Sequence, residues 1–338
     1  MSWCRLRAIS GASLTAVLCL GLMVACGSDD DSTGGADTGF DIEFTDTVEV
    51  STHAELEAAL EQAEEIEVEG DNGDNSDVFR ILVVADIDFD DDDQGWSYGG
   101  DVPLYIGGTD GDRKTIDASG AEQQILSTDS TGEDLFIEML RFTGADYGSS
   151  GGVLSISDSG NLYIKDAHFD DNHASNSGGV LDTGTSTAGT FWEGYAGTVV
   201  SIENSIFEGN TANRGGALSI NAGRLEVTNS EFVDNEASEE GGAIATHLET
   251  EIEDSRFEGN RIETHSSSFS GTAITAIGKP GDNDLEDSER RVWVRGVEFI
   301  DNVNTGTGPT TAITGASVYG EDEGNIFDPA DQEPDWEE

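Results

Sequence analysis

Basic residues are scarce in this sequence. Its 338 residues include 15 lysine and arginine residues against 70 aspartate and glutamate residues, which gives a formal net charge of −55. The resulting electrostatic field repels nucleic acid and other polyanions, so they are excluded as general partners. A halophilic, salt-adapted surface explains this composition, because molar salt shortens the screening length to about 3 Å. A calcium-loaded protein is the competing explanation, and charge alone is compatible with both.

Cysteine is also rare, and the three present are Cys4, Cys19 and Cys26. Residues 1–25 contain two arginines, no acidic residue and then an apolar stretch, which is typical of a signal peptide. The segment Leu22–Cys26 resembles the lipobox, the signal that makes the cysteine the lipidated first residue of a bacterial lipoprotein. Cleavage before Cys26 leaves one cysteine, so no disulfide can form within the mature chain.

We expect the lipid on Cys26 to attach the protein to the outer membrane, facing the periplasm or the cell surface. Gly27 is not the aspartate that retains lipoproteins at the inner membrane in enteric bacteria. A stop-transfer anchor is the alternative, but the apolar stretch Ala12–Ala25 is too short to span a bilayer comfortably. The mature chain loses Arg5 and Arg7 and no acidic residue, so its formal charge is 13 − 70 = −57.

A repeated unit dominates the rest of the chain. Phe207, Phe232 and Phe257 lie 25 residues apart, and each is followed three residues later by an asparagine. Before each phenylalanine, apolar or β-branched residues alternate with polar ones, and this period of two indicates a β-strand. After the first two asparagines, a polar run leads to Gly-Gly-Ala at 215–217 and 241–243, which indicates a turn into a second strand.

A unit this short cannot bury an apolar face alone, so successive copies must stack, with each strand parallel to its counterpart in the next copy. We therefore predict an all-β solenoid, a parallel β-helix of about eight coils. Stacking places like residue on like, which gives a column of interior phenylalanines and a ladder of asparagine amides at a bend. The predicted column and ladder contain Phe169, Phe207, Phe232, Phe257, Phe299, Asn172, Asn210, Asn235, Asn260 and Asn302.

The paired motifs Phe207–Asn210 with Gly215–Leu218, and Phe232–Asn235 with Gly241–Ile244, resemble the FxxN and GGA(I/L) repeats of the polymorphic outer-membrane protein family. The resemblance implies a right-handed parallel β-helix of the pectin-lyase-like superfold, displayed on a bacterial surface. It implies little about activity, because adhesins, lyases and hydrolases all use this solenoid.

The sequence divides into five segments. A signal peptide over 1–25 precedes a flexible acidic tether over 26–40, rich in glycine and serine. Residues 41–77 are predicted to form an N-terminal cap, whose amphipathic helix follows a serine or threonine N-cap and covers the open end of the solenoid. The solenoid occupies 78–320, and an acidic tail over 321–338 is expected to be disordered.

One acidic stretch has the spacing of a calcium-binding loop, with Asp90, Asp92, Gln94 and Asp101 as candidate ligands. Glutamate is usual at the last of these positions, and the helices that normally flank such a loop are not predicted here. Calcium is the one cofactor that the sequence leaves open, and no other cofactor is expected.

An insertion between two coils is predicted to form a loop that contains Phe191, Trp192 and Tyr195. Loops on a rigid scaffold commonly carry function, and the repeat offers these three aromatic residues no core position. As contact residues they would stack on a neutral sugar or a partner protein. The alternative is that they pack down on the side of the solenoid as a satellite cluster.

The sequence Asp170-Asp171 with His173 resembles the paired carboxylates and histidine of polygalacturonase-like hydrolases. Both aspartates occupy the variable positions of F-x-x-N, which favours solvated turn residues over a catalytic pair. No catalytic residue is assigned. We expect a monomeric, surface-attached lipoprotein that acts as a non-catalytic binding, adhesion or structural module. A polysaccharide lyase or glycosidase is the alternative.

Overall fold

The structure is a computed structural model, and the residues it describes belong to one compact unit, Ala36–Glu338. They are residues 40, 42, 44–66, 78–90, 92–109, 111–119, 121–128, 133–156, 160–184, 199–221, 223–247, 249–263, 271–276, 291–307, 310–314, 317–320, 324–328 and 333–334. The predicted signal peptide, Cys26 and nearly all of the predicted tether lie outside the described residues.

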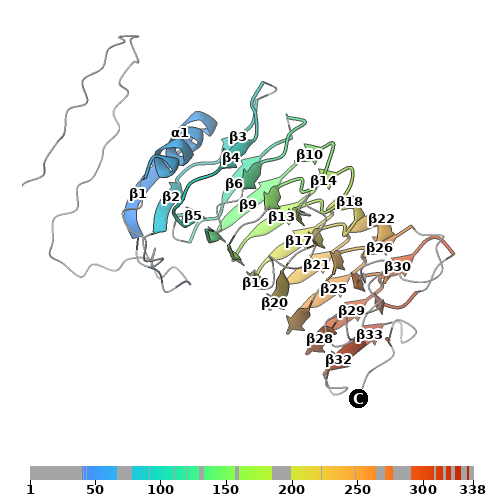
Figure 1. Cartoon of the computed structure of the whole chain (residues 1–338). Helices are drawn as coiled ribbons and strands as arrows, with labels where there is room; N and C mark the ends of the chain where they lie inside the picture. Colours follow the sequence, from blue (N-terminus) through green and yellow to red (C-terminus); the bar gives the residue numbers. More distant parts are fainter. Residues whose placement is uncertain are drawn as a thin grey trace, which may run out of the picture. The chain divides into compact units, whose positions relative to one another are not determined.

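Four parallel sheets run side by side along the chain, and each takes one strand from successive coils (Figure 1). The ten-stranded sheet contains β1 (Phe44–Val50), β2 (Val78–Val83), β5 (Leu104–Gly108), β8 (Leu135–Glu138), β12 (Leu162–Lys165), β16 (Val199–Glu203), β20 (Arg224–Thr228), β24 (Thr250–Glu253), β28 (Arg291–Arg295) and β32 (Ser317–Gly320). The nine-stranded sheet contains β3 (Ile87–Asp88), β6 (Lys114–Asp117), β9 (Leu140–Thr143), β13 (His168–Asp170), β17 (Ile206–Glu208), β21 (Glu231–Val233), β25 (Arg256–Glu258), β29 (Glu298–Ile300) and β33 (Ile326–Asp328).

The other two sheets complete each coil. The six-stranded sheet contains β10 (Asp146–Tyr147), β14 (His173–Ala174), β18 (Thr211–Arg214), β22 (Glu236–Glu240), β26 (Arg261–Ile262) and β30 (Val303–Asn304). The eight-stranded sheet contains β4 (Trp96–Tyr98), β7 (Leu126–Thr128), β11 (Leu154–Ile156), β15 (Leu181–Thr183), β19 (Leu218–Ile220), β23 (Ile244–Thr246), β27 (Ile274–Ala276) and β31 (Ile313–Thr314). The all-β parallel solenoid predicted from the repeat is confirmed. The predicted count of about eight coils is close, since six coils contribute to all four sheets and less regular coils lie at either end.

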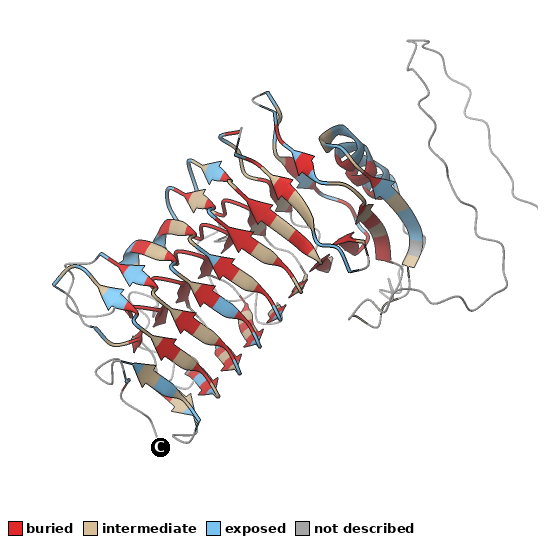
Figure 2. Ribbon diagram, turned by 180° about the vertical axis from the view of Figure 1, so that it is seen from behind, coloured by how far each residue is buried: buried red, intermediate tan, exposed pale blue. Residues whose placement is uncertain are grey.

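The phenylalanines stack face to face inside the solenoid. Phe207 and Phe232 have ring centroids 4.7 Å apart at an interplanar angle of 4°, and Phe232 and Phe257 are 4.7 Å apart at 2°. Consecutive strands of the nine-stranded sheet place these residues directly opposite one another. The column also extends to Phe327, whose ring lies 5.0 Å from that of Phe299. Burial alternates along strands such as β16, β20 and β24 because every second side chain points into this core (Figure 2), whereas β19 and β23 are buried throughout.

The position of Phe327 corrects one boundary. The sequence placed residues 321–338 in a disordered tail, but Ile326–Asp328 form β33, which pairs in parallel with β29. The aromatic stacking surface offered by Phe299 explains why this short segment joins the sheet, because a stacked ring buries apolar area that an unpaired tail would leave in water.

The asparagines form a continuous buried ladder. In each rung the side-chain Nδ2 donates to the Oδ1 of the next coil's asparagine, at 3.0 Å from Asn210 to Asn235 and 3.0 Å from Asn235 to Asn260. The same Nδ2 donates to a phenylalanine carbonyl oxygen, as in Asn235 to Phe207 at 2.9 Å. Each Oδ1 also accepts from the backbone N–H of the preceding asparagine, at 3.1 Å from Asn210 to Asn235. Every polar atom of these amides is therefore satisfied without water.

The tight turns explain further features of the repeat. The residue three positions before the phenylalanine has positive φ, with 53° at Asn204, 50° at Asn229 and 47° at Asp254. Asparagine and aspartate tolerate this left-handed conformation better than other non-glycine residues. The serine that follows builds a second ladder, in which the backbone N–H of Ser205 donates to the Oγ of Ser230 at 3.1 Å. This serine ladder was not predicted from the sequence.

A helix covers the N-terminal end of the sheets. α1 (His53–Glu64) begins after Thr52, whose side chain accepts a hydrogen bond from the backbone N–H of Glu55. Its buried residues are Leu56, Ala59, Leu60 and Ala63. The helix contacts β1, β2 and β4. The amphipathic cap helix predicted within 41–77 is present, and β1 in the same segment already belongs to the ten-stranded sheet.

Replacing Phe232 tests the stacked column. Phe232→Ala removes a fully buried ring between Phe207 and Phe257. The cavity should lower the free energy of unfolding by about 3–5 kcal/mol, measured by denaturant titration. Glu231→Ala changes the exposed neighbour on the same strand and should leave the free energy of unfolding nearly unchanged. Equal stability of the two variants would contradict the assignment of Phe232 to the interior and Glu231 to the surface.

Candidate functional site

The interior of the described coils is filled by apolar side chains and amide ladders, so chemistry has to come from the outward-facing rows. Two outward faces stand out. The nine-stranded sheet carries a cluster of charged residues on β9, β13 and β17, and the ten-stranded sheet carries a row of aromatic residues. In-register pairing aligns each outward row along the solenoid axis, because every strand repeats the alternation of its neighbour.

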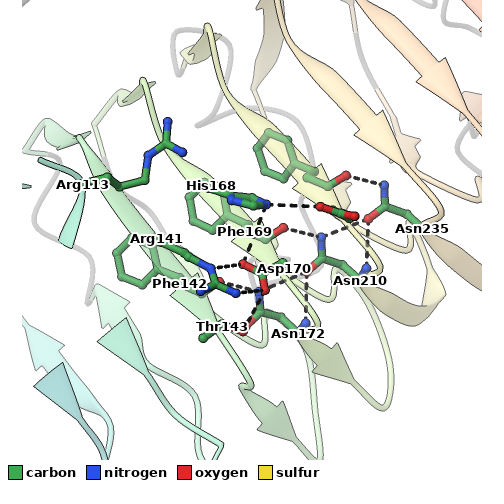
Figure 3. Close-up of polar contacts among 12 residues, drawn as sticks. Arg113, Arg141, Phe142, Thr143, His168, Phe169, Asp170, Asn172, Asn210 and Asn235 are labelled. Atoms are coloured by element: carbon green, nitrogen blue, oxygen red, sulfur yellow. Dashed lines mark hydrogen bonds and ion pairs between the residues drawn. The ribbon is translucent and has the colours of Figure 1, made fainter. Parts of the chain in front are cut away.

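Asp170 lies at the centre of the charged cluster (Figure 3). Arg141 on the neighbouring strand donates to both of its oxygens, from Nε to Oδ1 at 2.7 Å and from a terminal nitrogen to Oδ2 at 2.6 Å. The hydroxyl of Thr143 donates to Oδ2 at 3.0 Å. Burial by itself would raise the pKa of Asp170, but the hydrogen bonds from Arg141 and Thr143 outweigh it and hold that pKa below its usual value.

This geometry corrects the sequence interpretation of Asp170 as a solvated turn residue. Its side chain is 8% exposed and belongs to β13, where Arg141 from the preceding coil covers it. A contact between coils carries no local sequence signal, which is why the motif position alone was misleading. Asp171 is the turn residue, exposed and with a φ of 53°. The third residue of the proposed set, His173, lies on β14 and contacts Thr211 instead, with Nδ1 2.8 Å from Oγ1.

His168 lies beside this ion pair. Its Nε2 is 3.8 Å from Asp170 and 3.5 Å from Glu208 on β17, which is beyond hydrogen-bond distance in both cases (Figure 3). A histidine between two carboxylates has the residue types of an acid–base pair. Asp170, however, is ionised and already accepts three hydrogen bonds. As placed, it is a structural anion, with both of its oxygens engaged by Arg141 and one of them also by Thr143.

The predicted calcium ligands lie at the N-terminal end of the solenoid. Asp90, Asp92, Gln94 and Asp101 are all exposed, and the backbone N–H of Asp90 donates to the carboxylate of a different residue, Asp93, at 2.7 Å. In the described part of the chain, no group of three or more histidine, cysteine, aspartate or glutamate residues is arranged to hold a metal ion. Calcium binding by this stretch stays a prediction.

The aromatic row follows the outward face of the ten-stranded sheet. Its N-terminal part is covered by the chain itself, because Phe40 packs edge-on against Phe136 at 5.3 Å and Tyr163 at 6.1 Å. At the C-terminal part, Trp293 on β28 stacks on Tyr319 on β32 with centroids 4.7 Å apart and an interplanar angle of 25°. Trp293 is 37% exposed, and it is the one exposed large hydrophobic residue on this sheet within the described ranges.

Charged residues on the same face pair with one another next to Trp293. Glu251 lies directly opposite Trp293 on β24 and forms an ion pair with Arg224, which also contacts Glu226 at 3.2 Å. Arg295, two residues from Trp293 on β28, contacts Glu253 at 2.6 Å. The indole therefore borders both hydrogen-bond donors and acceptors.

The contact residues predicted from sequence, Phe191, Trp192 and Tyr195, lie outside the described residues. Trp293 was not selected from sequence, although a usable signal exists. Val292 and Val294 alternate with it in β28, and both are buried. An aromatic residue between two core valines must point outward, because adjacent strand residues face opposite sides.

A buried titratable group lies on the eight-stranded sheet. Asp182 on β15 is 7% exposed, and its Oδ1 accepts from the Nδ2 of Asn221 at 2.8 Å. Burial raises the pKa of Asp182 to about 6, against the opposing effect of hydrogen bonds from Ser219 and Asn221. Part of this carboxyl is therefore protonated in mildly acidic solution.

No family model, curated protein or solved structure matches this chain. Among the residues that the structure describes, no helix is long and apolar enough to cross a membrane. The candidate site is therefore judged from its own geometry.

Replacing Asp182 tests its burial. Because its folded pKa is raised, the unfolded carboxyl ionises first as pH rises from about 4 to about 6, and the folded state loses stability across that window. Above about pH 6 the folded state bears the full cost of ionising the buried Asp182 carboxyl, which is about 2–3 kcal/mol. Asp182→Asn should therefore be more stable than wild type by that amount at pH 8, and nearly equal at pH 4, in denaturant titrations.

The exposed Asp171 provides the control, because Asp171→Asn keeps a residue that tolerates positive φ. It should change stability little at either pH. A destabilised Asp182→Asn at pH 8, or a gain of the same size at both pH values, would contradict the burial of an ionisable carboxyl.

Proposed function

We propose that this protein is a lipid-anchored bacterial outer-membrane or cell-surface protein that acts as a non-catalytic binding or adhesion module. The observation that carries the proposal is Trp293, which is exposed on the face of a rigid parallel sheet and held there by stacking on Tyr319. Exposed aromatic residues on fixed scaffolds are typical of contact surfaces, because they bury a large apolar area with little loss of side-chain entropy.

The charged cluster around Asp170 supports a module without catalysis. Its carboxylate accepts hydrogen bonds from Arg141 and Thr143, so a reaction at Asp170 would first have to break an ion pair whose carboxylate is buried and whose guanidinium is partly exposed. Removing one partner of such a pair leaves an uncompensated charge and is strongly unfavourable. The resemblance of the repeats to the polymorphic outer-membrane protein family is consistent with surface display.

A carbohydrate-active enzyme is the second candidate. The observation that favours it is the convergence of carboxylate, arginine and histidine on one sheet face, where Glu208 and His168 lie 3.5 Å apart. In this case Glu208 would be the reacting carboxylate, because its side chain is 54% exposed whereas Asp170 is covered. The enzyme hypothesis predicts release of reducing sugar that disappears in Glu208→Gln.

The anchor is tested by mass spectrometry of the membrane-extracted protein. We expect an N-terminus at Cys26 that carries a diacylglyceryl group, because the lipobox-like segment places this cysteine at the cleavage point. Cys26→Ala should accumulate as unprocessed precursor. An intact or unacylated N-terminus in the wild-type protein would contradict lipid attachment.

Binding and cleavage are tested in one sample. The full-length protein is applied to immobilised glycans and surface proteins, and reducing sugar is measured in the supernatant. We expect retention without sugar release, and at least a tenfold loss of retention in Trp293→Ala, because the exposed indole supplies the contact area. Sugar release by wild type but not by Glu208→Gln would favour the enzyme. Retention that Trp293→Ala leaves unchanged would contradict the proposed surface.

A further inference from the structure

We infer that Trp293, together with the paired charges of Glu251 and Arg295 on the same face, forms a binding site for an uncharged saccharide. This inference rests on the proposed binding function and names the ligand class of that surface. It is separate from the contact site predicted at residues 191–195, which lie outside the described residues.

The indole of Trp293 is fixed in place before any ligand binds. Trp293 belongs to a strand paired on both sides, to β24 through Glu251 and to β32 through Tyr319. Its ring stacks on Tyr319 at 4.7 Å, which limits the rotamers that it can adopt. A preorganised aromatic ring loses little conformational entropy on binding, and this matters most for a small ligand with few contacts.

The polar groups around the ring include both hydrogen-bond donors and acceptors. A sugar hydroxyl is both a donor and an acceptor, so a saccharide site has to offer both kinds of group. Arg295 and Glu253 provide a guanidinium and a carboxylate on one side of Trp293, and Arg224 and Glu251 provide the same two groups toward β20. Their side chains are between 38% and 60% exposed, so they remain accessible to hydroxyl groups.

The charges around Trp293 favour an uncharged ligand. On this part of the face the guanidinium groups of Arg224 and Arg295 pair with the carboxylates of Glu226, Glu251 and Glu253. An anionic ligand would meet these carboxylates within a chain of net charge −55, and a cationic ligand would have to compete with the arginines. An uncharged ligand avoids both costs.

The small size of the exposed apolar surface favours a saccharide over a protein partner. Specific protein interfaces bury about 800 Å² per partner around a core of several aromatic or aliphatic residues. Among the described residues, the other exposed large hydrophobic side chains are Val303 on β30 and Ile326 on β33, which belong to different sheets. The indole of Trp293, with Tyr319 stacked beside it and polar groups around it, is too small for such a core but matches the size of one sugar ring.

The test is a titration of the full-length chain with defined hexasaccharides, in which binding is measured by tryptophan fluorescence and by calorimetry. Cellohexaose, chitohexaose and maltohexaose are the neutral probes, and hexagalacturonate is the anionic probe. We expect at least one neutral probe to bind, with a dissociation constant raised about tenfold or more in Trp293→Ala. Ile326→Ala is the matched control, because it removes an exposed apolar side chain from another sheet and should bind like wild type.

Arg295→Gln covers the case in which Trp293→Ala does not fold. Its side chain is 60% exposed, so the fold should tolerate the change, while a hydroxyl partner is lost and binding should weaken about threefold. Wild-type affinity in both Trp293→Ala and Arg295→Gln would overturn the site. Tighter binding of hexagalacturonate than of every neutral probe would overturn the ligand class.

The same experiment distinguishes failure of this inference from failure of the proposed function. If none of the neutral hexasaccharides binds, but retention on the array of glycans and surface proteins still depends on Trp293, the saccharide inference is wrong and the binding function stands. If neither the titration nor the array shows dependence on Trp293, both are wrong.

Discussion

The buried asparagine ladder is the constraint on which the rest of this structure depends. Each amide can be satisfied only when the next coil places its own asparagine at the same point, as Asn235 does between Asn210 and Asn260. A shift of one residue in any coil would leave buried donors and acceptors without partners, and each such group costs about 1–3 kcal/mol. The ladder therefore fixes the register of the nine-stranded sheet, and the phenylalanine column follows from it.

Fixed register has a consequence for the surface. Stacking places like on like, which suits rings and amides in the interior but would place like charges side by side outside. The outward rows vary between coils and form ion pairs instead, including Lys165 with Glu203, Arg256 with Glu298 and Arg261 with Glu236. Most of the lysine and arginine residues that the structure describes form ion pairs between coils. The surplus of acidic residues remains on the solvent side, and Trp293 is the exposed large hydrophobic residue of the ten-stranded sheet within the described residues.

The sequence predicted the interior well, because interior positions repeat. The 25-residue spacing located Phe207, Phe232 and Phe257, and the asparagine that follows each was placed at a bend. The end of the solenoid was predicted poorly, because Phe327 has no asparagine three residues later and an acidic run precedes it. The stacking of Phe327 on Phe299 brings β33 into the fold, and no local sequence pattern indicates this contact.

The candidate site was harder to predict for the same reason. The partners of Asp170 and Trp293 come from other coils. Which residues become partners depends on how the strands of neighbouring coils align, and the sequence repeat gives that alignment only approximately. Arg141 lies 29 residues before Asp170, and Tyr319 lies one coil beyond Trp293. The serine ladder was also missed, although a serine occurs at the same position of three successive coils, at 205, 230 and 255. Positions that vary between coils need three-dimensional neighbours before their role can be assigned.

The most direct test of this account is the stability of Asn235→Ala, measured by denaturant titration together with hydrogen exchange at the amide of Asn210. The change removes the acceptor for two donors of Asn210 and the donor to Phe207 and Asn260. The account predicts a loss of about 3 kcal/mol or more and faster exchange at Asn210. Asn213→Ala, at an exposed asparagine of β18, should change neither. A loss below about 1 kcal/mol in Asn235→Ala, with exchange unchanged, would show that the amide ladder does not set the register.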